Sequence, residues 1–141
     1  MEDNIRLTVI GIQSNAEDND PIELQTTGKW FNKNNKEHII YTDHQLIDTQ
    51  PTKTRVSIDG SNVSVIRSGG INTHLVFEQG VSHIIPYETS FGILEMVSYT
   101  KEISLTVTKT TIELKVIYNL EINHTDMGEN IFHISATRLD D

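Results

Sequence analysis

Apolar side chains occupy every second position from residue 112 to residue 122 of this chain, and all residues between them except Ile117 are polar. Because side chains alternate between the two faces of an extended chain, this pattern predicts a strand with one apolar and one polar face. The run is about twice the usual strand length, which favours a coiled sheet or a barrel. The apolar positions are Ile112, Leu114, Val116, Tyr118, Leu120 and Ile122.

Alternating segments separated by turn residues predict further strands before this run. The expected strands are residues 5–15, 22–31, 38–46, 54–58, 63–67, 74–78 and 81–86. Asn34 and Asn35 tolerate the left-handed backbone of a tight turn. Asp59-Gly60 and Gln79-Gly80 each predict a hairpin between the strands that flank them.

The last part of the chain is also rich in strand-forming residues. Residues 92–108 are expected to form one bent strand or two, residues 123–130 a loop, and residues 131–139 the final strand. This gives nine to eleven strands, no helix of useful length, and turns about every ten residues, as in antiparallel sandwiches and barrels. Short connections favour an up-and-down order, and closure removes the exposed edges of the sheet. We therefore expect one domain, residues 1–141, forming an antiparallel β-barrel, with a β-sandwich as the alternative.

Composition limits the function more than it identifies it. A chain of 141 residues can bury a core without disulfides or metals, and the absence of Cys excludes a disulfide scaffold, an iron–sulfur cluster and a thiol nucleophile. The first residues lack the pattern of a signal peptide, and the longest apolar runs are too short to cross a membrane, which predicts a cytoplasmic protein. The net charge of −9 disfavours nucleic acids and anionic membranes as partners.

Several short segments together carry a resemblance to a known family. Trp30 is followed in order by Ile-Tyr-Thr-Asp at 40–43, Val-Ile-Arg-Ser-Gly at 65–69, Leu-Val-Phe at 75–77, Tyr-Glu-Thr-Ser-Phe-Gly at 87–92 and Tyr-Asn-Leu at 118–120. Over nearly its whole length the chain resembles the YwiB-like family of small bacterial proteins. The resemblance implies a lipocalin-like (calycin-like) closed β-barrel. It implies no catalytic residues, because the family has no assigned function.

Arg67 is the most informative candidate for binding. It has the same parity as Val63 and Val65, which places it on the face expected to line the barrel interior. A guanidinium among apolar side chains must be paired or hydrated, and it could hold a ligand carboxylate or phosphate. The alternatives are a structural ion pair with Glu23 or Glu95, or a position in water at the barrel rim.

Three tyrosines are also expected to point inward, because each shares its parity with an apolar neighbour on the same strand. Together with Arg67 they would line an apolar pocket with polar tips, or they would simply fill the barrel. The candidate ligand-binding residues are Arg67, Tyr41, Tyr87, Tyr118, Trp30 and Thr89.

No pattern in the chain points to a reaction. There is no Gly-x-Ser-x-Gly motif, the six His show no spacing typical of a metal site, and the glycines fit turns better than a phosphate loop. We therefore predict no catalytic residue, metal or cofactor. The expected function is a non-catalytic module that holds a small, partly apolar or anionic ligand inside the barrel, as a monomer or homodimer. The alternative is a structural or protein-interaction module with a solidly packed barrel.

Overall fold

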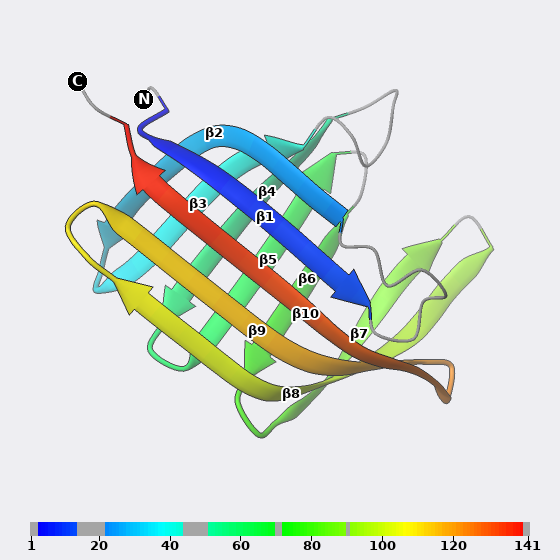
Figure 1. The fold of residues 1–141 in the computed structure, drawn as a ribbon. Coiled ribbons are helices and arrows are strands. Elements are labelled where there is room, and N and C mark those ends of the chain that lie inside the picture. Colours follow the sequence, from blue (N-terminus) through cyan, green and yellow to red (C-terminus); the bar gives the residue numbers. More distant parts are fainter. Residues whose placement is uncertain (1–2, 14–21, 44–50, 70–71, 90, 140–141) are drawn as a thin grey trace.

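Ten strands make up most of the computed structural model (Figure 1), which describes residues 3–13, 22–43, 51–69, 72–89 and 91–139. Those residues contain no helix with the length and hydropathy that a membrane crossing needs. The number of strands agrees with the sequence prediction. The strands are β1 (Ile5–Gln13), β2 (Ile22–Lys33), β3 (Lys36–Asp43), β4 (Thr52–Asp59), β5 (Asn62–Gly69), β6 (Thr73–Glu78), β7 (Ser82–Thr89), β8 (Gly92–Val107), β9 (Thr111–Ile122) and β10 (Thr125–Arg138).

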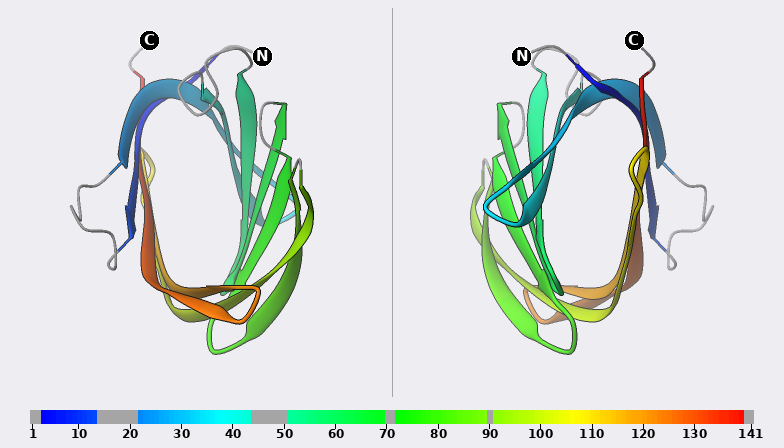
Figure 2. Two further views of the ribbon diagram at one scale, coloured as in Figure 1. Left: turned by 90° about the vertical axis from the view of Figure 1, so that its right-hand side faces the viewer. Right: turned by 90° about the vertical axis from the view of Figure 1, so that its left-hand side faces the viewer.

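All ten strands belong to one antiparallel sheet in the order β6-β5-β4-β3-β2-β1-β10-β9-β8-β7. The sheet curls so that β1 pairs with β10, and the remaining seam lies between β6 and β7 (Figure 2). At the seam, Gly80 N–H donates to the carbonyl of Thr100 over 2.8 Å, and Thr100 N–H donates to the carbonyl of Val81 over 3.2 Å. The predicted antiparallel barrel is confirmed, and it is nearly closed.

Two local predictions were wrong. Gln79-Gly80 forms a turn, but β6 and β7 do not pair as a hairpin, because the backbone of the turn bonds to β8 instead. Residues 123–130 are not a loop: Asn123 and His124, with φ of 49° and 68°, form a tight turn, and β10 begins directly after it. The ends of two predicted strands, residues 14–15 and 44–46, lie outside the described residues.

The other turns and the long strand follow the expected chemistry. Asn34 and Asn35 have φ of 55° and 64°, as two-residue hairpin turns require. Residues 92–107 form one strand whose register shifts between Thr100 and Glu102, which is the bend expected of a long strand in a curled sheet.

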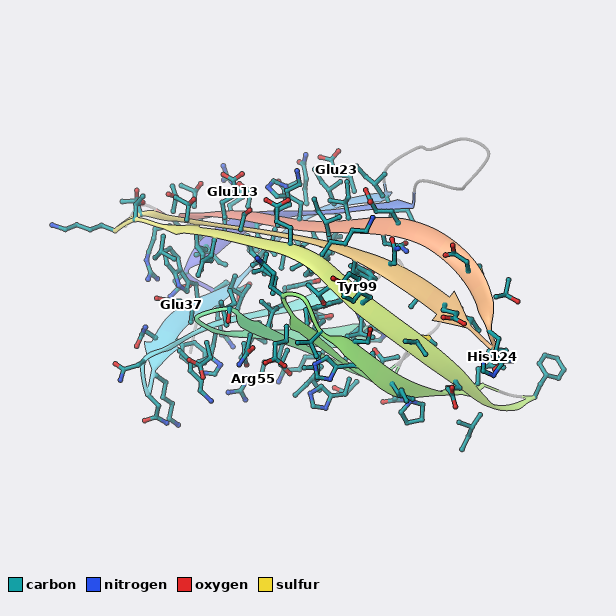
Figure 3. All side chains as sticks on the ribbon, turned by 90° about the horizontal axis from the view of Figure 1, so that it is seen from below. Glu23, Glu37, Arg55, Tyr99, Glu113 and His124 are labelled. Atoms are coloured by element: carbon teal, nitrogen blue, oxygen red, sulfur yellow. The ribbon has the colours of Figure 1, made fainter. Side chains whose placement is uncertain are left out.

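The apolar core fills the half of the barrel near the turns that follow β2, β4 and β8. The apolar row of β9 points inward, and its Ile112, Leu114 and Val116 are at most 1% exposed. Trp30 closes this end: its Nε1 donates to Glu37 Oε2 over 2.7 Å, and the Arg138 guanidinium lies 3.9 Å from its ring centroid. Side chains on the outer face, such as Glu113 and Arg55, point away from the interior on opposite walls (Figure 3).

Gly28 is the residue at which β2 changes partner. Residues 22–28 pair with β1, whereas residues 28–33 pair with β3, so β2 arches from one wall of the barrel to the other (Figure 2). A Cβ at Gly28 would lie 2.4 Å from the carbonyl oxygen of Ile40. The position therefore requires glycine for close approach of two strands, and beyond it the two walls separate.

We expect Gly28→Ala to destabilise the barrel by roughly 1–3 kcal/mol, because the added methyl group would push β2 off β3. Gly11→Ala is the matched control: Gly11 is on the neighbouring strand, and a Cβ there meets nothing within 4 Å. Urea unfolding of the two variants and the wild type measures the difference. Equal losses of stability in both variants would contradict this role of Gly28.

Candidate functional site

A cavity of about 220 Å³, open to solvent beside the 73% exposed Ile22, lies between the walls where they separate beyond Gly28. One side belongs to β1, β2 and β10 and is apolar, and the other belongs to β3, β4 and β5 and is mainly polar. The residues that line it are Val9, Gly11, Ile22, Leu24 and Phe132 on the apolar side, and Tyr41, Asp43, Thr54 and Arg67 on the polar side. The site therefore offers one end to a polar group and the other to an apolar group.

Strand register brings the polar residues together. Tyr41 on β3 pairs with Thr54 on β4, and Thr54 pairs with Arg67 on β5. Arg67 pairs in turn with Thr73 on β6. All four are therefore at one level of the barrel and on its inner face. Asp43 is two residues beyond Tyr41 and only 8% exposed, so its carboxylate borders the same cavity.

Arg67 lies on the inner face, as its parity with Val63 and Val65 predicts. It forms no ion pair with any acidic side chain that the structure describes, and its Nε is buried without a hydrogen-bond partner. The two acidic residues considered from the sequence do not reach it. Glu23 is exposed and accepts a hydrogen bond from Gln25 over 2.8 Å, and Glu95 is exposed on β8.

Two of the predicted tyrosines lie close to this guanidinium. Tyr41 comes from one wall, and Tyr118 on β9 comes from the other, where its ring centroid is 4.8 Å from that of Phe77. Burial raises the pKa of both phenols, and the positive charge of Arg67 partly opposes the rise. Both hydroxyl groups are therefore neutral near pH 7 and can donate hydrogen bonds.

Further inward-facing hydroxyl groups have no hydrogen-bond partner among the described residues. They are Thr52, Thr73, Ser98 and Thr100, and their side-chain oxygens are buried. Buried polar groups in folded proteins are nearly always bonded to protein, water or a ligand. The level of the barrel around Arg67 is therefore polar, in contrast to the apolar end closed by Trp30.

The structure does not bring all predicted site residues to the cavity. Trp30 is 2% exposed and packs at the opposite end of the barrel, and Tyr118 is near Arg67 without lining the cavity. Tyr87 and Thr89 belong to β7, opposite Leu94 and Gly92, and their side chains lie outside the described residues. A role for Tyr87 and Thr89 in binding stays a prediction.

Sequence reasoning missed several lining residues. Asp43 and Thr54 have the parity of inward-facing neighbours, so alternation alone could have identified them. Gly11 and Phe132 face each other across β1 and β10, and only the pairing of the first strand with the last places them in the cavity. No signal within either segment predicts that contact.

A family model described as "Domain of unknown function (DUF1934)" matches residues 7–134 of the chain. The chain belongs to the DUF1934 family. All nine residues that line the cavity fall within the matched range.

One relative and one solved structure extend this DUF1934 assignment. The chain is 29% identical over 136 residues to the "Uncharacterized beta-barrel protein YwiB" of Bacillus subtilis (strain 168), which covers 96% of this chain and 93% of the relative. It also matches the crystal structure of the ywiB protein from Bacillus subtilis with a TM-score of 0.82 and 27% identity, over 98% of this chain and 93% of the other. The predicted resemblance to the YwiB-like family is confirmed.

The raised pKa of the buried tyrosines predicts how stability changes at high pH. The unfolded chain loses its phenolic protons near pH 10, whereas folded Tyr41 and Tyr118 keep theirs to a higher pH. The unfolded state then binds fewer protons, so stability falls as pH rises through that range. Urea unfolding measures the free energy of unfolding at about pH 8 and at about pH 10.5. The decrease between these two pH values should be smaller for Tyr41→Phe than for wild type. Tyr99→Phe, on a side chain that is 42% exposed, should behave as wild type, and an unchanged loss in Tyr41→Phe would contradict the assignment.

Proposed function

We propose that this barrel is a non-catalytic binding protein that holds one small molecule in the cavity beside Arg67. The observation that carries the proposal is a half-buried cationic side chain that lines open space, has its Nε buried, and has no partner among the described residues. A charge held partly out of water without a partner is unfavourable. A ligand that pairs with the charge removes part of that cost.

The size of the cavity supports a small ligand. Pockets for drug-sized molecules have volumes of roughly 300–1,000 Å³, and this cavity of about 220 Å³ is smaller. It corresponds to the liquid volume of roughly seven water molecules. A ligand of about the size of a single amino acid or a short-chain acid would fill it.

Gly11 supports a binding role because its lack of a side chain helps to keep the cavity open. Glycine inside a strand is unfavourable, since it costs chain entropy and gives nothing to pack. A Cβ at this position would meet no atom within 4 Å. A larger residue would fill the space and stabilise the barrel. The barrel with Gly11 is therefore less stable than it could be, which is common at functional sites.

The lining residues also support binding over nucleophilic catalysis. Among the described residues that line the cavity, the hydroxyl groups are those of Tyr41 and Thr54, and no histidine lines the cavity to act as their base. We also propose the cytoplasm as its site of action, because a chain without cysteine fits a reducing compartment.

We expect Gly11→Ile to keep or raise the melting temperature and to abolish ligand binding, because the new side chain occupies the cavity. Native mass spectrometry of protein purified from cells should show a bound small molecule on the wild type and none on the variant. Thr8→Ile, on the outer face of the same strand, is the control and should retain the molecule.

A bound molecule that persists in Gly11→Ile would place the binding site elsewhere. Wild-type protein with no bound molecule, and with no stabilisation by any member of a small-molecule library, would contradict the proposal. That result would favour the alternative, a structural or protein-interaction module.

A further inference from the structure

We propose that the ligand is a small carboxylic acid that carries a single negative charge and a short apolar tail. This inference rests on the proposed function and names the chemical class of its ligand. The carboxylate is held by Arg67, and the tail lies against Val9, Leu24 and Phe132.

The charges around the cavity favour one negative charge on the ligand. Arg67 is the single cationic side chain among the described lining residues, and Asp43 is the single acidic one. One guanidinium balances one negative charge, so a second negative charge on the ligand would stay without a cationic partner among these lining residues. A phosphate group carries about 1.5 to 2 negative charges at pH 7 and is commonly bound at a helix N-terminus, and the described chain contains no helix.

The donors at the polar end suit a planar carboxylate. Arg67 lines the cavity, and of its guanidinium nitrogens only Nε is buried without a partner, so the two terminal nitrogens are the accessible donors. Two parallel N–H bonds from a guanidinium match the two oxygens of a carboxylate. The neutral hydroxyl groups of Tyr41 and Thr54, opposite each other in register, can donate to the remaining lone pairs.

The opposite wall accounts for the apolar tail. Val9 and Leu24 are paired directly across β1 and β2, and Phe132 lies on β10, the other neighbour of β1. These three side chains offer no hydrogen bond to a ligand, so an apolar group there is favoured by burial. With about 220 Å³ available for the whole molecule, the tail is limited to a few carbon atoms.

Sodium hexanoate is the probe for this assignment, with 1-hexanol and hexyl phosphate as comparison compounds that contain the same number of carbon atoms. Calorimetric titration should show hexanoate binding at least tenfold more tightly than either compound. Arg67→Gln should weaken hexanoate binding at least tenfold, and Arg67→Lys should restore only part of it because the ammonium lacks the planar fork. Lys115→Gln, which removes one positive charge from the exposed outer face of β9, should leave binding unchanged.

The unfolding midpoint of each variant without ligand provides a check on folding. Arg67→Gln removes an unpaired and partly buried charge, so its midpoint should equal or exceed that of the wild type. A folded Arg67→Gln variant that binds hexanoate as tightly as wild type would overturn the inference, and so would equal binding of hexanol or tighter binding of hexyl phosphate. Failure of all three compounds to bind would also overturn it. In each case, native mass spectrometry of wild type and Gly11→Ile still tests separately whether the barrel holds a small molecule from the cell.

Discussion

The positive charge of Arg67 inside the barrel is the constraint that organises the interior. Arg67 is half-buried with its Nε out of contact with water, and a charge in that position is unfavourable among apolar side chains, so its surroundings must be polar, hydrated or occupied by an anion. The hydroxyl groups of Tyr41, Thr54 and Thr73 lie at its level of the barrel. The other end, around Leu114 and Trp30, holds most of the buried apolar side chains, and Glu37 and Arg138 contact Trp30 at its edge. The barrel therefore separates an apolar half from the half that we propose binds a ligand.

The change of partner in β2 explains why space is present on the Arg67 side. A strand that pairs with one neighbour along its first half and with another along its second half forms a corner between two walls. Gly28 permits the close contact at the corner, and Gly11 leaves the space beyond it unfilled. The geometry that closes the barrel at one end thus opens a cavity at the other. A substitution that filled this cavity would stabilise the fold at the expense of the proposed binding.

Alternation predicted most of the fold because each strand has one buried face, and the period of two is a local property of the chain. It placed Arg67, Tyr41 and Tyr118 on the inner face. It could not give their level along the barrel, and for this reason Trp30 was grouped with residues at the opposite end. The first half of β10 was missed because the register shift between Asp126 and Glu129 breaks the alternation there. Closure between β1 and β10, and the seam at β6 and β7, depend on contacts between distant segments that no local pattern records.

A crystal structure of the protein as purified from cells tests this account most directly, through the surroundings of the Arg67 guanidinium. The account predicts that the guanidinium lies between Tyr41 and Tyr118 and that electron density from a non-protein molecule larger than water contacts its terminal nitrogens. A guanidinium turned out into solvent, or one paired with a carboxylate of its own chain, would contradict it.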